Sequence, residues 1–248
     1  MASFTRLTAD QMETLSEIVF GLTITFSAIQ FALNPPSHIA EILDLICEFA
    51  ISFTFLVWVW ITYIRIMRNL RKGDDPPVLL NVILLLLATV EPYLLYIVWL
   101  STFQTPGQSA AEQLSSEVLA AAYAIDVGLV LVVLGMLARQ PPADPVRGPN
   151  PILKEAVRRY SNWLYGCAGA FFVTALPAFW ILVYSASFAD GTAGYFSPWV
   201  HLQLILWIPI FIALGVGSYH YGRGIDHVLD QGTSSPPGLA AVQPAESE

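Results

Sequence analysis

Long apolar segments alternate with short polar or proline-rich segments along the 248-residue chain. The apolar segments reach or exceed the roughly 18–20 residues that an α-helix needs to cross the hydrocarbon core of a bilayer. Runs such as residues 82–90 show no alternation of apolar and polar positions, so a membrane β-barrel is disfavoured. The pattern predicts six membrane-spanning helices, at residues 14–33, 39–64, 78–103, 118–137, 163–186 and 199–218.

The composition agrees with this pattern. Hydrophobic residues make up 55% of the chain and charged residues only 12%, whereas soluble domains carry about 25% charged residues. The expected fold class is therefore an all-α, polytopic membrane protein. We expect residues 1–227 to form a six-helix transmembrane domain. Residues 228–248 are rich in Ser, Pro, Ala and Gly, and we expect a disordered cytoplasmic tail there.

The positive charges lie on one side of the predicted spans. Cytoplasmic loops of membrane proteins carry an excess of Lys and Arg. All 11 basic residues fall before the first span, in the second or fourth loop, or after the last span. Both termini are therefore expected in the cytoplasm, in a multi-pass protein of the cell membrane.

Four carboxylic acids lie inside the predicted spans, at Glu17, Glu48, Glu91 and Asp126. Such residues are costly in hydrocarbon and are functional candidates by default. Pro92 disrupts the helix ladder, so a protonated Glu91 bonded to a freed main-chain carbonyl is one interpretation. The other is a proton-coupled transporter that uses Glu91 and Asp126 as carriers.

An acidic stripe marks the outer end of the second span. Glu41, Asp44 and Glu48 are spaced i, i+3, i+7 and share one helix face. Such a stripe would concentrate cations at an entrance. The alternative is a solvated helix end with carboxylates near its N-terminus.

The chain lacks the sequence motifs of common enzymes and metal sites. There is no G-x-S-x-G, no H-E-x-x-H and no glycine-rich phosphate loop, and the four histidines are scattered. Cys47 and Cys167 sit singly inside spans. We expect no catalytic residue, no metal, no cofactor and no nucleic-acid partner.

Two stripes run along the first span at steps of three and four residues. The apolar stripe is Leu15, Ile18, Leu22, Phe26, Ile29 and Leu33, and the polar stripe is Ser16, Thr23, Ser27, Gln30 and Asn34. Periodicity alone directs the polar stripe at water or at another helix, and hydrogen bonding between helices is its usual role. The stripes are about 100° apart on a helix of 3.6 residues per turn, so only one can line a pore.

Several segments resemble one family. Residues 14–25, T-L-S-E-I-V-F-G-L-T-I-T, resemble the first-helix signature of the transmembrane protein 175 family of potassium channels, R-x-x-x-F-S-D followed by A-I-x-I-T. Residues 52–65, 79–93 and 123–124 are similar to its second, third and fourth helices. The chain departs from the family at Gln11, Leu15, Glu17, Tyr63 and Ile64, where the family has Arg, Phe, Asp and two His.

The resemblance implies a homotetramer in the lipid bilayer that conducts potassium ions through a pore lined by the first helix. The signature residues are Leu15, Ser16 and Glu17. The constriction aligns with Leu22, below Phe26 and Ile29, and a threonine linked to selectivity aligns with Thr25. We follow the resemblance over the periodicity, because hydrophobic constrictions can gate by dewetting. A transporter, or a membrane interaction protein without conduction, remains the alternative.

The charge pattern makes a prediction about topology. With Cys47 and Cys167 replaced by alanine, Gly107→Cys and Gly191→Cys should react with a membrane-impermeant thiol reagent added outside intact cells. Gly148→Cys should react only after permeabilisation, because its loop lies among the basic residues. Labelling of Gly148→Cys in intact cells would contradict the six-span topology.

Overall fold

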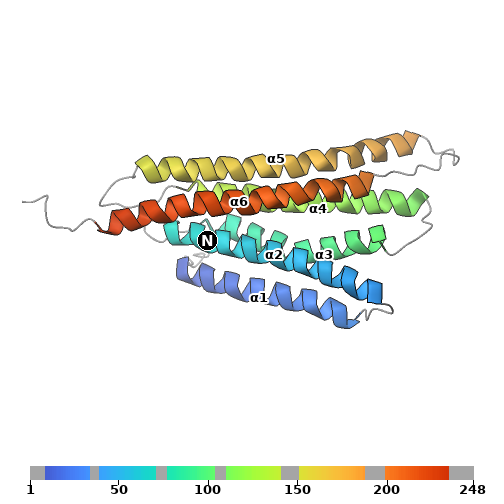
Figure 1. The fold of residues 1–248 in the computed structure, drawn as a ribbon, viewed down its shortest axis with the longest axis horizontal. Coiled ribbons are helices and arrows are strands. Elements are labelled where there is room, and N and C mark those ends of the chain that lie inside the picture. Colours follow the sequence, from blue (N-terminus) through green and yellow to red (C-terminus); the bar gives the residue numbers. More distant parts are fainter. Residues whose placement is uncertain are drawn as a thin grey trace, which may run out of the picture.

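The computed structural model describes residues 9–33, 39–70, 77–103, 110–140, 151–187 and 199–234. These ranges are helical and contain no strand. The helices, drawn in Figure 1, are α1 (Ala9–Leu33), α2 (Ile39–Leu70), α3 (Val78–Phe103), α4 (Ala110–Ala138), α5 (Pro151–Ser187) and α6 (Trp199–Ser234). The all-α fold class and the six helices are confirmed.

Every helix except α3 extends beyond its predicted span, and the extensions are longest in α4, α5 and α6. α4 begins at Ala110 and α5 at Pro151, before the apolar stretches that defined the predictions. A helix continues for as long as its backbone hydrogen bonds do, and the membrane limits only its apolar part. α6 continues to Ser234, so residues 228–234 are helical, where we expected a disordered tail. The good helix formers Leu229 and Gln231 prolong α6 there.

The chain is a polytopic membrane protein. Within the described residues, four segments are long and apolar enough to cross a membrane: Leu45–Met67, Val78–Leu100, Ser116–Ala138 and Ile205–Gly224. They belong to α2, α3, α4 and α6. α1 carries Glu13 and Glu17, and the first turns of α5 carry Lys154 and further charged residues, which lowers the hydropathy of both helices. That α1 and α5 also cross the membrane stays a prediction.

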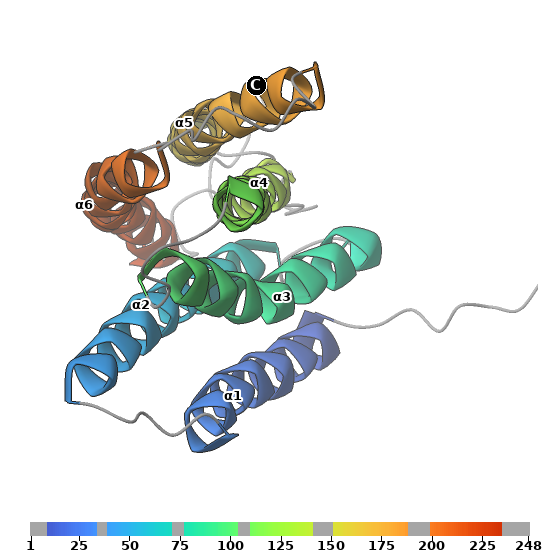
Figure 2. The ribbon, with the colours of Figure 1, turned by 90° about the vertical axis from the view of Figure 1, so that its right-hand side faces the viewer.

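α4 lies inside the bundle, while α1 and α5 lie at opposite edges (Figures 1 and 2). α4 contacts α2, α3, α5 and α6, whereas the main neighbours of α1 are α2 and α3. Many α4 side chains are fully buried, among them Val127, Leu131 and Leu134. The interior of the bundle is therefore filled by side chains along α4.

Small residues allow α4 and α5 to pack closely. A Cβ atom added at Gly128 would lie 2.6 Å from Cε1 of Phe172, and one added at Gly135 would lie 2.7 Å from Cε1 of Tyr165. Both aromatic residues belong to α5. Ser161 of α5 also donates a hydrogen bond to the Gly135 carbonyl at 2.8 Å. Small residues at a helix interface are the usual means of close approach in a membrane, where no hydrophobic effect drives association.

One end of α6 is held against α2 and α5. Gly222 leaves room for the Arg65 guanidinium of α2, and Gly217 leaves room for the Trp163 indole of α5. Between them, the Tyr160 hydroxyl lies 3.5 Å from the side-chain oxygens of Thr62 in α2 and Ser218 in α6. α2 and α6 are thus tied together near residues 62–65 and 218–222.

This packing makes a prediction about stability. Gly135→Val should lower the free energy of unfolding by about 1–3 kcal/mol, because the added side chain displaces the Tyr165 ring in a packed interface. The matched control is Gly166→Val in α5, where an added Cβ meets no atom within 4 Å. Thermal unfolding in detergent measures both variants. Equal midpoints for the two would contradict the close approach of α4 and α5.

Candidate functional site

The apolar stripe of α1 points away from the rest of the chain. The exposed fraction is 53% for Leu22, 58% for Phe26 and 42% for Ile29, and Leu15 and Ile18 are also exposed. Figure 2 shows α1 at the edge of the bundle, with one side uncovered. The three residues predicted to form the constriction therefore share a face that is left uncovered within the described part of the chain.

The polar stripe of α1 is turned inward. Ser16 and Thr23 are buried, with exposed fractions of 0% and 4%. The Ser16 hydroxyl donates to the Glu13 carbonyl at 2.7 Å, and the Thr23 hydroxyl donates to the Val19 carbonyl at 2.8 Å. Both hydroxyls thus bond to carbonyls of their own helix while packing within the bundle. The side chains of Ser27 and Gln30 lie outside the described part.

Thr25 lies on the exposed side of α1, one helical turn from Leu22. Its hydroxyl donates to the Gly21 carbonyl at 2.8 Å. A hydroxyl has one hydrogen and two acceptor lone pairs. Because the hydrogen is used within the helix, the oxygen remains able to accept a hydrogen bond from water or to contact a cation.

The signature residues of α1 lie beside one end of α2, but the residues in contact there differ from those of the family pattern. Leu15 and Glu17 are exposed, whereas Ser16 is buried beside the fully buried Tyr63. Tyr63 replaces one histidine of the family pattern. Arg65 packs instead against Gly222 of α6, so the end of α2 contacts both α1 and α6.

Glu91 occupies the centre of a polar cluster between three helices. It is fully buried in α3. One carboxylate oxygen accepts a hydrogen bond from the Ser52 hydroxyl of α2 at 2.8 Å, and the other accepts one from the Tyr123 hydroxyl of α4 at 3.1 Å. Its partners are therefore side-chain hydroxyls, rather than the main-chain carbonyl freed by Pro92 that the sequence suggested.

Two more carboxyl groups lie close to this cluster. Asp126 and Glu48 are near enough to Glu91 for their charges to interact, and each is 95% buried. Within the described residues, one carboxylate oxygen of Asp126 has no hydrogen-bond partner. Because its side chain is 95% buried, Glu48 faces the interior and not the solvent, in contrast to the acidic stripe predicted for it. The side chains of Glu41 and Asp44 lie outside the described part.

Sequence reasoning identified Glu91 and Asp126 but missed the roles of Ser52 and Tyr123. The three residues of the cluster come from three helices and are 39 and 32 positions apart in the chain. At these separations, helical periodicity within one segment cannot reveal that the three residues are in contact. A buried acid without a basic residue at the same depth was the signal that hydroxyl donors had to be present.

Part of the chain matches a known protein family. Residues 11–92 match the family model described as the endosomal/lysosomal potassium channel TMEM175. The match spans 82 of the 248 residues, and over this range the chain is similar to the TMEM175 family. Comparison with curated proteins and with solved structures gives no match.

The TMEM175 match covers α1 from Gln11, all of α2, and α3 as far as Pro92. It therefore includes Leu22 and Thr25 on the exposed side of α1. It also includes Glu91 and its partner Ser52, whereas Tyr123 and Asp126 lie beyond it. The resemblance predicted from the sequence is thus confirmed for the N-terminal third of the chain.

The Glu91 cluster makes a prediction that a double-mutant cycle can measure. Tyr123→Phe removes one donor to a buried carboxyl group and should lower the free energy of unfolding by about 1 kcal/mol. In a Glu91→Leu background the same substitution should cost much less, because the acceptor is gone. Unfolding in SDS titrations gives the four free energies. Equal costs in both backgrounds would exclude the hydrogen bond.

Proposed function

We propose that this protein is a potassium-conducting cation channel built from several copies of the chain, with α1 lining the pore. The match of residues 11–92 to a family described as a potassium channel supports the activity. The observation that carries the proposal lies inside that match: an apolar face of α1, which includes Leu22 and Phe26, is left uncovered by the residues that the structure describes.

Packing within one subunit argues for a pore between copies. The side chains along α4 fill the interior, and Val127, Leu131 and Leu134 are fully buried. An ion path therefore belongs at the edge of the bundle, where α1 lies. Closed symmetric assembly places the same face of every copy around one axis. A homotetramer, as the resemblance implies, would enclose a pore in this way.

Leu22 is proposed as the constriction of that pore, with Phe26 and Ile29 on one side of it. A ring of large aliphatic side chains excludes water from a narrow passage, and a hydrated ion then meets a barrier. Thr25 supplies the nearest hydroxyl on the same side of α1. Its hydrogen is bonded to Gly21, which leaves the oxygen for a dehydrating cation.

Carboxylates supply the negative charge that a cation pathway needs. Glu41 and Asp44 remain the proposed outer stripe that raises the cation concentration at the entrance. Glu48 is left out of this part of the proposal, because its side chain is buried. Glu17 and Leu15, which are exposed on α1, are proposed to hold neighbouring copies at the other end, while the buried Ser16 packs inside its own subunit.

The proposal predicts the effect of two substitutions in α1. Leu22→Ala should raise the current in reconstituted liposomes and weaken the preference for potassium over sodium, because the ring becomes wider and less apolar. A barrier lower by ~1.4 kcal/mol corresponds to about a tenfold faster flux. Thr25→Ala should change the potassium-to-sodium ratio with a smaller effect on total current.

Matched controls exist on α3. Leu86 is exposed to a similar degree as Leu22, and Thr89 bonds to the Leu86 carbonyl at 2.7 Å just as Thr25 bonds to its own helix. Leu86→Ala and Thr89→Ala should leave flux unchanged. Native mass spectrometry of the same preparations gives the number of copies.

Two results would replace the proposal. Unchanged flux in Leu22→Ala, together with thiol block of Ser27→Cys, would assign the pore to the polar stripe. Absence of potassium flux at every voltage and pH, with proton-driven uptake that Asp126→Asn abolishes, would favour the transporter. The burial of both Asp126 and Glu91 inside the bundle is what keeps the transporter testable.

A further inference from the structure

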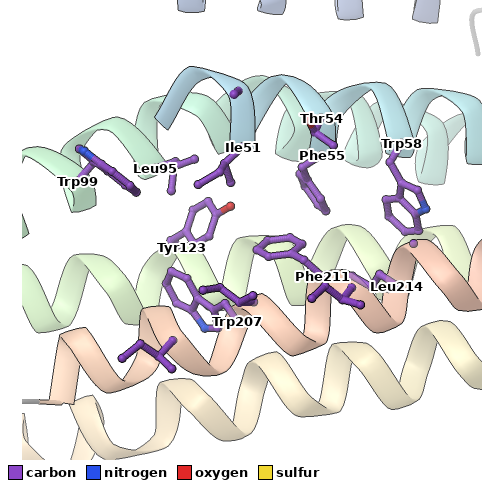
Figure 3. A pocket seen from close by; sticks show the side chains of 15 residues that line it. Ile51, Thr54, Phe55, Trp58, Leu95, Trp99, Tyr123, Trp207, Phe211 and Leu214 are labelled. Carbon is purple, nitrogen blue, oxygen red and sulfur yellow. The ribbon is translucent and has the colours of Figure 1, made fainter. Parts of the chain in front are cut away.

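An apolar cavity of about 720 Å³ lies between α2 and α6. Its floor is formed by α3 and α4, and Figure 3 shows Phe55 of α2, Tyr123 of α4 and Phe211 of α6 projecting into it. The cavity has a size typical of pockets for small ligands, about 300–1,000 Å³. It is separate from the exposed face of α1, since no residue of α1 lines it.

The cavity lies at the depth of the membrane. Every residue that lines it belongs to one of the four candidate spans. Its walls are aliphatic and aromatic apart from the hydroxyls of Thr54 and Tyr123 and the indole N–H groups. One of these, on Trp207, is already bonded to Thr174 at 3.0 Å. A wall of this kind offers too few polar partners to hold water.

The cavity opens sideways between α2 and α6. Ile51 on one rim and Ile205, Ile208 and Ile212 on the other are exposed. α2 and α6 approach each other through the rings of Phe55 and Phe211, whose centroids are 5.7 Å apart. The outer part of the space between the two helices therefore faces the hydrocarbon of the bilayer.

The cavity is long in the direction of the helices. On α6 its lining runs from Ile205 to Gly215, about 15 Å at a rise of 1.5 Å per residue. That length is half of the roughly 30 Å hydrocarbon core. Trp99 marks the end near the membrane surface, and Trp58 marks the end near the middle of its span (Figure 3). By the predicted topology, this half is the outer leaflet.

We propose that an acyl chain of an outer-leaflet phospholipid occupies this cavity. In a bilayer, lipid acyl chains surround the opening of the cavity. An acyl chain is apolar and elongated, which matches the walls and the length of the cavity. An empty cavity would leave its lining atoms without dispersion contacts. The assignment concerns a lipid site and stands whether or not the protein conducts ions.

Tyr123 connects this lipid site to the buried carboxyl group. Its ring lines the cavity and lies tilted against that of Trp207, with centroids 5.0 Å apart, while its hydroxyl donates to Glu91. An acyl chain against the ring restricts the ring to the position in which the hydroxyl reaches Glu91. Occupancy of the cavity thus supports the polar cluster between α2, α3 and α4.

Photolabelling of the full chain in liposomes tests the proposal. The probes are phosphatidylcholines with a diazirine near the ester or near the methyl end of one acyl chain. The first should label residues near Trp99 and Ile205, and the second should label residues near Trp58 and Gly215. Mass spectrometry of peptides locates the adducts.

Filling the cavity should abolish this labelling. An added Cβ at Gly215 meets no atom within 4 Å, so Gly215→Phe can place its ring in the cavity without a backbone clash. Gly224→Phe is the matched control, because Gly224 also has open space, lies on the same helix and is not part of the lining. Thr54→Trp fills the cavity from α2 if Gly215→Phe fails to fold.

Three outcomes would overturn the lipid assignment. Cavity residues could remain unlabelled while exposed residues outside it, such as Val216, are labelled. Labelling could come from a diazirine fatty acid and not from the phospholipid, which would indicate a free-acid ligand. Disulfide cross-linking of Ile208→Cys between two copies would assign the cavity to a subunit interface.

Discussion

The close approach of α4 to α5 is the interaction on which the rest of the structure depends. In hydrocarbon, helices gain nothing by hiding apolar surface, so contact and hydrogen bonding must hold them together. Gly128 and Gly135 let aromatic rings of α5 lie directly on the backbone of α4. With α4 fixed in the interior, Tyr123 and Asp126 face inward, and α3 and α6 have a surface on which to pack.

The same packing leaves α1 with few neighbours. α2 and α3 cover the side of α1 that carries Ser16 and Thr23, and none of the described helices covers the side that carries Leu22. The arrangement separates two tasks. The bundle around α4 supplies rigidity, and the edge helix offers a surface to whatever lies beyond the subunit. A pore formed there can change its constriction residue with little effect on the core.

Much of the fold could be predicted from the length and position of apolar runs, because membrane thickness sets the length of a spanning helix. The start of α4 and the end of α6 could not, since a helix continues outside the membrane wherever its backbone hydrogen bonds do. At the start of α5, Glu155 forms ion pairs with Arg158 and Arg159. The burial of Glu48 was also missed, because helical spacing alone does not say which face turns inward. The partners of Glu91 depend on contacts between distant segments, which a single sequence does not reveal.

The double role of Tyr123 constrains which residues evolution can place there. Phenylalanine would preserve the wall of the cavity but leave one oxygen of Glu91 without its donor, and serine would offer a hydroxyl but lose the ring. Tyrosine alone among the common residues supplies a ring and a terminal hydroxyl at that reach. In related chains, an acidic residue at position 91 should therefore occur together with tyrosine at position 123. Where position 91 is apolar, phenylalanine becomes acceptable at position 123.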